Sequence, residues 1–229
     1  MKTFIVYTAI TKGYDKLKPP PGQWENEADF IAFLDHPQPD TGWDTRPLHQ
    51  EFLDPCRNAK IHKILPHVYF PKAQYSLWID GSVEVKSTWP LHQWIEEYLR
   101  EHDLAVFKHR YHDCIFQEGR ICLQLELDDP AAINRQMKRY FTERYPFHNG
   151  LAECTILLRR HSPAIVRFNE AWHEEIMNGS RRDQLSFNYV VHKLGVKYFS
   201  LPGTISENPH FSLQPHVKKR RKFSAVAQR

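Results

Sequence analysis

Residues Tyr75–Val85 read YSLWIDGSVEV, and this stretch decides the fold class. A run of β-forming residues ends at Asp80, Gly81 and Ser82 follow, and a second strand-like run comes after them. A carboxylate at the end of a buried strand, followed by a glycine that lets a ligand approach the backbone, is how many α/β enzymes hold a metal ion or a phosphorylated substrate. Asp-Gly is also a common hairpin pair, so the stretch alone leaves both interpretations open.

Segments typical of strands and of helices alternate on both sides of this stretch. Strands are expected at Phe4–Ile10, Phe30–Leu34, Gln74–Ile79, Leu104–Phe107, Thr155–Leu158 and Val196–Phe199. Helices are expected at Asp54–Leu65, from a cap at Ser87 or Thr88 to Arg100, and at Ile115–Leu127, Ala131–Glu143, Ala164–Met177 and Asp183–Leu194. The alternation predicts an α/β fold with a mostly parallel central sheet flanked by helices on both faces. Ligands of such sheets bind beyond the carboxyl ends of the strands, where Asp80 would lie.

Length and composition indicate one globular domain. The chain has 229 residues, of which 41% are hydrophobic and 13% aromatic, which excludes a disordered protein. No apolar run is long enough to cross a bilayer, and Phe4–Ile10 is too short for the core of a signal peptide. The four cysteines form no CxxC pair, which argues against a zinc ribbon. We therefore expect reduced thiols in a cytoplasmic protein.

Charge separates a body, residues 1–212, from a basic tail, residues 213–229. The net charge is +4, but the tail carries six basic residues and no acid, so the body alone has a charge of −2. Such a body is not a broad basic surface, and no nucleic-acid partner is expected. The tail can contact anionic lipid, which would place the protein peripherally at a membrane. A solvated, disordered end is the simpler expectation.

Two segments ahead of Asp80 are candidate nucleotide contacts. After the first strand, a loop with small hydroxyls, a glycine and Tyr14 can present backbone N–H groups and an aromatic face to a nucleotide, although an ordinary loop explains it equally well. It matches neither the Walker nor the GxGxxG pattern. Arg57 and Lys60 follow helical spacing and suit a diphosphate, but a solvated basic helix face has the same spacing.

Three segments from Asp80 onward are candidates for metal, acceptor and catalytic roles. Asp80 with Ser82 suits Mg²⁺ or Mn²⁺, because these ions take few carboxylates together with phosphate oxygens. Asn149-Gly150 predicts a tight turn before a strand, after which Arg160 and His161 follow. Asp183 and Gln184 lie at a helix start, where Asp183 can orient or deprotonate an acceptor hydroxyl; a purely structural capping box that begins at Ser180 is the alternative.

The order of these segments resembles one family. VYTAITKGYDKL, RNAKIHKILPHVYFP, YSLWIDGSVEV, HNGLAECTILLRRH and RRDQLSFNYV follow one another as in the TOD/MUCI-type glycosyltransferase-like domain family, over Thr3–Phe199. The resemblance implies a GT-A-like single domain that uses a sugar nucleotide and a divalent metal. It implies nucleotide-sugar binding by Thr8, Tyr14, Asp35, Arg57, Lys60, Asp80, Gly81 and Ser82, acceptor or sugar binding by Asn149, Gly150 and Arg160, catalysis by Asp183 and Gln184, and a metal at Asp80 and His161.

The expected activity is transfer of a sugar from a nucleotide-diphosphate sugar to a hydroxyl of a saccharide or glycolipid acceptor, in polysaccharide or glycoconjugate synthesis. One departure from the family pattern stands out, because Ser82 occupies the place of the second carboxylate of a DxD-type motif. Two other functions stay open. One is a metal-assisted hydrolase that uses Asp80, Asp183 and histidines, and the other is a non-catalytic nucleotide- or polyanion-binding module anchored by the tail.

Overall fold

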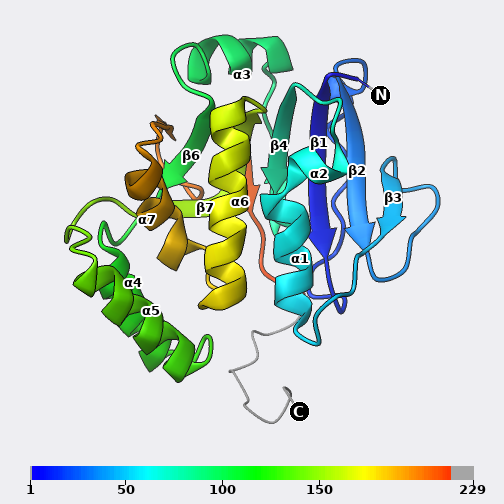
Figure 1. The fold of residues 1–229 in the computed structure, drawn as a ribbon. Helices are drawn as coiled ribbons and strands as arrows, with labels where there is room; N and C mark the ends of the chain where they lie inside the picture. Colours follow the sequence, from blue (N-terminus) through cyan, green and yellow to red (C-terminus); the bar gives the residue numbers. More distant parts are fainter. Residues whose placement is uncertain (1, 218–229) are drawn as a thin grey trace.

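A seven-stranded sheet forms the centre of the computed structural model, which describes residues 2–217 (Figure 1). Its strands are β1 (Phe4–Ile10), β2 (Ala28–Leu34), β3 (Asp44–Pro47), β4 (Tyr75–Ile79), β6 (Leu104–Lys108), β7 (Ala152–Arg160) and β8 (Phe199–Leu201). They lie in the order β3-β2-β1-β4-β7-β6-β8. Neighbouring strands run parallel except for β7, which is antiparallel to both β4 and β6. The predicted mostly parallel α/β fold is therefore confirmed.

Helices connect the strands. They are α1 (Pro55–Ile64), α2 (Pro66–Tyr69), α3 (Leu91–Tyr98), α4 (Ile115–Gln124), α5 (Pro130–Thr142), α6 (Pro163–Asn178) and α7 (Gln184–Leu194), with a 3₁₀ turn, η1, at Gly22–Trp24. Local sequence explains several starts: Asp54, Asp129 and Ser162 each cap a helix whose first residue is proline. A proline costs no hydrogen bond there, because that N–H has no partner within the helix.

Two apolar layers cover the sheet, one on each face. On one face, Tyr7 and Trp78 pack with Phe168, Trp172 and Phe187 from α6 and α7, and α1 lies over the same face. The other face packs against α3, η1 and a second, two-stranded sheet that pairs β5 (Val83–Val85) with β9 (Phe211–Leu213). The sheet is thus covered on both faces, as the sequence predicts.

Four local expectations are corrected by the structure. The last strand of the large sheet is Phe199–Leu201, later than the predicted Val196–Phe199. Ser87 does not cap α3, whose N-cap is Pro90 without a side-chain bond. Ser180 does not cap α7 either, because its hydroxyl donates to Asp128 and Asp183 itself is the N-cap. The Asp-Gly pair makes a turn but no hairpin, since β5 pairs with β9 and not with β4.

The predicted boundary at residue 213 falls inside β9. Beyond it, the backbone N–H of Gln214 donates to the carbonyl of Ser82 over 2.7 Å, and His216 Nδ1 lies 2.8 Å from Asp15 Oδ1. Residues 213–217 therefore belong to the folded body, whereas the basic run after residue 217 lies outside the described residues. Within residues 2–217, no helix is both long and apolar enough to span a bilayer.

Candidate active site

A buried lysine joins the two carboxylates that the sequence singles out. Lys63 is 1% exposed, and its Nζ lies 3.1 Å from Asp80 Oδ1 and 2.7 Å from Asp183 Oδ2. The Lys60 ammonium also donates to Asp183 Oδ2. Removing one member of such a buried ionic group leaves the others uncompensated, which is strongly destabilising. The strand end at Asp80 and the helix start at Asp183 are thus tied together through α1.

The backbone of Lys63 is held by two residues from the middle of the sheet. Tyr7 on β1 donates its hydroxyl to the Lys63 carbonyl over 2.8 Å, and the Arg159 guanidinium on β7 donates to the same oxygen over 2.7 Å. Arg159 is fully buried and also donates to Asn169 on α6 over 3.0 Å. The last carbonyls of a helix have no partner within the helix, and these two bonds satisfy one of them at the end of α1. They also fix the position of the Lys63 backbone, from which the side chain extends toward Asp80 and Asp183.

The lysine and aspartate side chains of this group keep one another charged, because each shifts the pKa of its partner. Burial alone would lower the pKa of Lys63, but the carboxylates of Asp183 and Asp80 outweigh burial and hold that pKa above its ordinary value. Burial alone would raise the pKa of Asp183, but Lys60, Lys63 and Arg182 hold that pKa well below its ordinary value. Asp183 therefore stays ionised, and it is suited to orienting groups rather than to accepting a proton.

Asp80 keeps one carboxylate oxygen available. Lys63 Nζ and Trp78 Nε1 both donate to Oδ1, the indole over 2.6 Å, and Oδ2 accepts no bond from residues 2–217. The side chain is 30% exposed, so this oxygen can be reached from solvent. The backbone N–H of Asp80 donates to the Thr155 carbonyl over 2.9 Å, which ties the turn after β4 to β7. The available oxygen thus lies at the carboxyl end of β4.

The loop after β1 packs directly on the turn at Gly81. A Cβ at this position would lie 2.9 Å from Ile10 Cγ1 and 3.1 Å from Asp15 Cβ, so the turn needs a glycine for close approach. Asp35, just after β2, accepts the backbone N–H of Lys12 in the same loop. The Tyr14 ring packs at a tilt against His216, with ring centroids 4.5 Å apart. The structure thus brings Tyr14, Asp35 and the Asp80 turn to one edge of the sheet, at the ends of β1, β2 and β4.

Asp80 fits a divalent metal as a single protein ligand. Among the described residues, no group of three or more His, Cys, Asp or Glu side chains is arranged to hold a metal. Ser82, at the second position of the DxD-like motif, is 3% exposed. Mg²⁺ and Mn²⁺ do bind through one carboxylate when substrate phosphates and water supply the remaining oxygens. Asp80 Oδ2 matches that pattern, so Asp80 is the one described residue that we retain as a predicted metal ligand.

His161 and Arg160 lie at the opposite edge of the sheet, which corrects their predicted roles. Because β7 is antiparallel to β4, its last residue, Arg160, pairs with Tyr75 at the start of β4. The backbone N–H of His161 donates to the Gln74 carbonyl, six residues before Asp80, which is about 20 Å along a strand. His161 cannot complete a metal site with Asp80. Arg160 instead forms an ion pair with Asp103 at 3.1 Å, on the same remote edge.

Two further predicted contacts with the donor are occupied or buried. The Arg57 guanidinium donates to the carbonyls of Ile176 and Gly179, the latter over 2.8 Å, so it satisfies the end of α6 and does not face a diphosphate. Thr8 is 3% exposed within β1 and does not extend into the loop. Lys60 lies at the site, but its ammonium is paired with Asp183. The sequence pattern of basic residues does not reveal these partners.

Asn149 and Gly150 precede β7, so they lie toward the edge that carries Asp80. Gly150 has a φ of +85°, a conformation that favours glycine, and a Cβ there would lie 3.1 Å from Asn188 Nδ2. Asn149 donates to the Tyr145 hydroxyl over 3.4 Å. Neither residue is bonded to Asp80 or Asp183, and their predicted role in acceptor binding stays a prediction.

Glu153, like Lys63, is a residue at this edge that sequence reasoning missed. It follows Ala152 at the start of β7, and its Oε1 accepts from Gln184 Nε2 over 3.2 Å. Burial, with added repulsion from Asp80 and Asp183, raises the pKa of Glu153 to about 7. The missing signal is strand direction, because a carboxylate at the start of a strand reaches this edge only if the strand is antiparallel.

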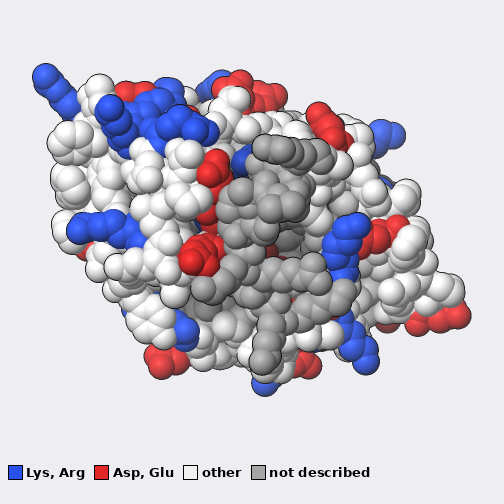
Figure 2. All heavy atoms as spheres, turned by 90° about the horizontal axis from the view of Figure 1, so that it is seen from below, with Lys and Arg blue, Asp and Glu red and all other residues white. Residues whose placement is uncertain are grey.

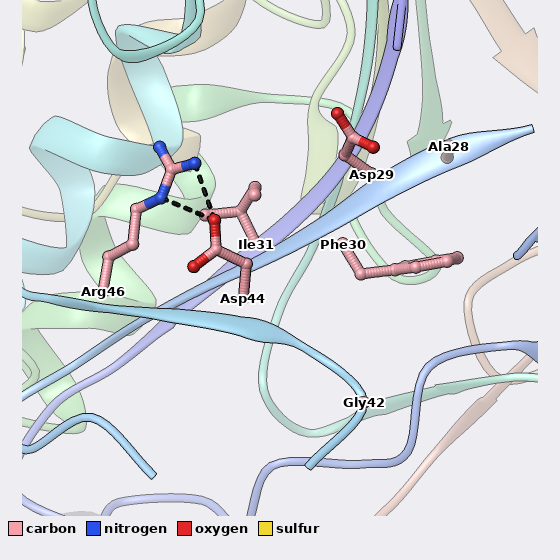
Figure 3. A pocket seen from close by; sticks show the side chains of 7 residues that line it. All are labelled: Ala28, Asp29, Phe30, Ile31, Gly42, Asp44 and Arg46. Atoms are coloured by element: carbon pink, nitrogen blue, oxygen red, sulfur yellow. Dashed lines mark hydrogen bonds and ion pairs between the residues drawn. The ribbon is translucent and has the colours of Figure 1, made fainter. Parts of the chain in front are cut away.

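The charges on the surface at this edge of the sheet are consistent with a binding site there (Figure 2), and a hollow beside the edge strand contains none of the predicted site residues. Figure 2 looks onto the face toward which β1 and β2 point in Figure 1, and acidic side chains gather near its middle with basic ones at its margins. A hollow beside the edge strand contains the ion pair of Arg46 and Asp44 (Figure 3). Its lining consists of Ala28, Asp29, Phe30, Ile31, Gly42, Asp44 and Arg46, none of them a predicted site residue.

Comparisons with known proteins point to one protein family. Residues 46–204 match the family model described as "TOD1/MUCI70, glycosyltransferase-like domain", a match that begins later than the expected Thr3. The probable hexosyltransferase MUCI70 of Arabidopsis thaliana is 30% identical over 156 residues, covering 64% of this chain and 26% of that protein. The alkaline ceramidase TOD1 of Arabidopsis thaliana is 23% identical over 150 residues, covering 61% and 32%. The chain thus spans about a quarter to a third of these relatives.

Solved structures extend the comparison to the fold. A crystal structure of a glycosyltransferase involved in the glycosylation of the major capsid of PBCV-1 superposes with a TM-score of 0.51, at 10% sequence identity. The alignment covers 95% of this chain and 96% of that one. The fold is GT-A-like over nearly its whole length.

Proposed function

The chain belongs to the TOD1/MUCI70 glycosyltransferase-like domain family, and from this premise we propose that it transfers a sugar from a nucleotide-diphosphate sugar to a hydroxyl acceptor. Family and fold together support a glycosyltransferase. The observation that carries the finer proposal is the available Oδ2 of Asp80 at the carboxyl end of β4, beside the loop of Tyr14. Open α/β sheets bind their ligands at such edges.

The donor is proposed to lie along the ends of β1, β2 and β4. The base is proposed to lie beside the loop of Tyr14, whose ring packs against His216, and Asp35 fixes this loop. Asp80 Oδ2 would hold a Mg²⁺ or Mn²⁺ ion, and Gly81 allows the diphosphate to approach the backbone. When bound, that ion supplies positive charge for the departing diphosphate. Lys60 and the buried Lys63 keep the Asp183 carboxylate ionised.

The acceptor is proposed to enter beside the start of α7. Gln184 begins this helix, and its side chain links Arg182 with Glu153 through bonds of 2.9 and 3.2 Å. A saccharide or glycolipid hydroxyl directed at this polar edge would meet the donor at Asp80. Action in the cytoplasm, with peripheral membrane contact through the basic tail, completes the proposal; the tail's basic run lies outside the described residues.

Replacement of Asp80 tests the donor site. We expect Asp80→Asn to abolish the stabilisation by Mn²⁺ with nucleotide sugar, which for a wild-type protein at 100 times Kd amounts to a Tm rise of about 5–10 °C. The matched control is Asp103→Asn: its carboxylate is similarly exposed and also 3.1 Å from a cation, but it lies at the remote edge. A panel of UDP- and GDP-sugars, each with and without Mn²⁺, provides the donors. Full donor response in Asp80→Asn would exclude this site.

A hydrolase is the second candidate, because one relative is named an alkaline ceramidase. Within the described residues, the acidic edge contains Asp183, which holds the lysines in place, and also Asp80 and Glu153, carboxylates that can bind or activate water. The two functions differ in their need for a nucleotide. Release of fatty acid from a ceramide in the absence of any nucleotide sugar would favour the hydrolase, whereas sugar transfer that depends on the nucleotide would favour the transferase.

A further inference from the structure

Glu153 is placed at the site by the reversal of β7. Since β7 runs antiparallel to β4, its first residues lie beside the last residues of β4, and the Thr155 carbonyl binds the Asp80 N–H. Glu153 lies two residues before Thr155, which is about 7 Å along a strand. The pairing of β6 with β7 also shifts register here, from Val106 opposite Leu157 to Phe107 opposite Glu153. Such irregularities re-aim side chains and are common near active sites.

Both carboxylate oxygens of Glu153 face polar groups, and the side chain still reaches solvent. Oε1 accepts from Gln184 Nε2 over 3.2 Å, and Oε2 lies 3.7 Å from His109 Nε2. The side chain is 17% exposed. The charged and titratable groups that act on it from the surrounding elements are Asp80, Asp183, Lys63, Arg182 and His109.

The two carboxylates beside Gln184 differ in what they can do with a proton. Asp183 is bound by two lysine ammonium groups, is nearly buried and has a pKa well below its ordinary value, so it is a poor proton acceptor. Among residues 2–217, no lysine or arginine lies within ion-pair distance of Glu153, and burial with the nearby carboxylates raises its pKa to about 7. A general base works best when its pKa lies near the working pH. His109 contributes no competing positive charge, since burial lowers its pKa to about 4.

We propose that Glu153, and not Asp183, takes the proton from the acceptor hydroxyl, an inference that rests on the proposed transferase function. The acceptor oxygen forms a bond to the anomeric carbon, and the bond from that carbon to the diphosphate oxygen breaks, its electron pair leaving with the diphosphate. The hydroxyl proton passes to a carboxylate oxygen of Glu153, which later releases it to solvent. Gln184 positions the Glu153 carboxylate through its amide N–H, and Asp183 keeps Lys60 and Lys63 in place.

Glu153→Gln tests this step, because the amide keeps the shape of the side chain but accepts no proton. The assay is Mn²⁺-dependent hydrolysis of UDP-glucose, UDP-galactose or GDP-mannose, in which water serves as acceptor, and donor binding is followed separately by thermal shift. We expect kcat to fall about 100-fold or more while the donor Kd stays within threefold. Wild-type kcat/KM should rise with pH and level off above about 7, and the variant should lose this dependence.

Two companion variants separate chemistry from folding. Glu153→Asp should recover part of the activity and the pH dependence, whereas a purely structural role would give it no advantage over the amide. Glu175→Gln replaces another buried glutamate, which is bonded to Tyr140 and Arg139 of α5 and is not among the groups that act on Glu153, and it should leave the pH profile unchanged. Wild-type pH dependence in Glu153→Gln, with activity within threefold, would overturn the inference. If none of the donors binds the wild-type protein, the proposed function itself fails.

Discussion

At the scale of single residues, the site depends on a lysine that cannot reach water. Lys63 is 1% exposed and lies between Asp80 and Asp183, so its charge is compensated entirely by protein groups. Taking an ammonium ion out of water costs several kcal/mol unless partners replace the hydration. The positions of Asp80 and Asp183 are therefore linked to folding stability through one cation.

Asp183→Asn should destabilise the protein by about 3–5 kcal/mol, because it leaves Lys60 and Lys63 without the carboxylate that holds their charge. Denaturant unfolding followed by tryptophan fluorescence measures the change. The control is Asp113→Asn, which removes an exposed carboxylate paired with His148 and should cost less than about 1 kcal/mol. Equal effects of the two substitutions would contradict a buried ionic group.

Glu153 should make the stability of the protein depend on pH. Its folded pKa, about 7, lies above the ordinary value, so its stabilising effect is complete below pH 4.5 and is lost as pH rises through 7. Ionisation of the buried carboxyl costs the folded state about 3 kcal/mol relative to the unfolded state. Comparing the unfolding free energies of wild type and Glu153→Gln from pH 4.5 to 8 isolates this slope. Parallel curves for the two proteins would show that the carboxyl is unshifted.

The sequence predicts part of the candidate site and misses the rest for a physical reason. The sequence predicts Asp80 because strand, carboxylate and glycine are adjacent, and it predicts Asp183 because a helix start has a local pattern. Lys63 and Glu153 join the site only through contacts across α1, β4, β7 and α7, which no local pattern records. Whether Arg57 faces a ligand or a helix end likewise depends on α6, more than a hundred residues away.

At the scale of elements, Arg57 links the start of α1 to the end of α6. Its guanidinium donates to two carbonyls that α6 leaves without partners. The same residue was predicted to bind a diphosphate, and the two roles have different consequences when it is replaced.

We expect Arg57→Ala to lower the free energy of unfolding by about 1–3 kcal/mol, because buried carbonyls lose their donors, and to leave donor affinity unchanged. Arg167→Ala on the exposed side of α6 is the control and should have little effect on either quantity. Unfolding curves and donor titrations on the same samples measure both. A loss of donor affinity at unchanged stability would restore the predicted diphosphate contact.

At the scale of the whole molecule, two segments far apart in sequence meet at the site, the loop after β1 and residues 211–217. Residues 211–217 pair with β5, bind Ser82 and contact Asp15 and Tyr14, although they lie more than a hundred residues from all of them. The alternation of strands and helices gave the α/β class and its two covered faces. Strand order and the reversal of β7 were not predictable, because they depend on how distant segments pack.

Two truncations should have opposite outcomes. Removal of residues 218–229 should leave the donor-induced shift in Tm unchanged, since Asp80, Asp35 and the other proposed donor contacts all belong to residues 2–217. Removal of residues 211–229 should lower Tm and weaken the donor response, because β5 loses its partner strand and Phe211 leaves the core. Thermal shift with the donor panel measures both. Loss of ligand binding with the shorter deletion alone would favour a polyanion-binding module anchored by the tail.

The place of β1 in the middle of the sheet limits how this domain can be produced as a fragment. A chain that began at residue 46, where the family similarity begins, would lack both β1 and β2. The edge of β4 that pairs with Phe4–Tyr7 would then be open, and an open edge in the middle of an apolar sheet invites pairing with other chains. Arg159 would also lose the Tyr7 hydroxyl beside it. Such a fragment should aggregate on expression, and soluble preparations will need the first forty-five residues.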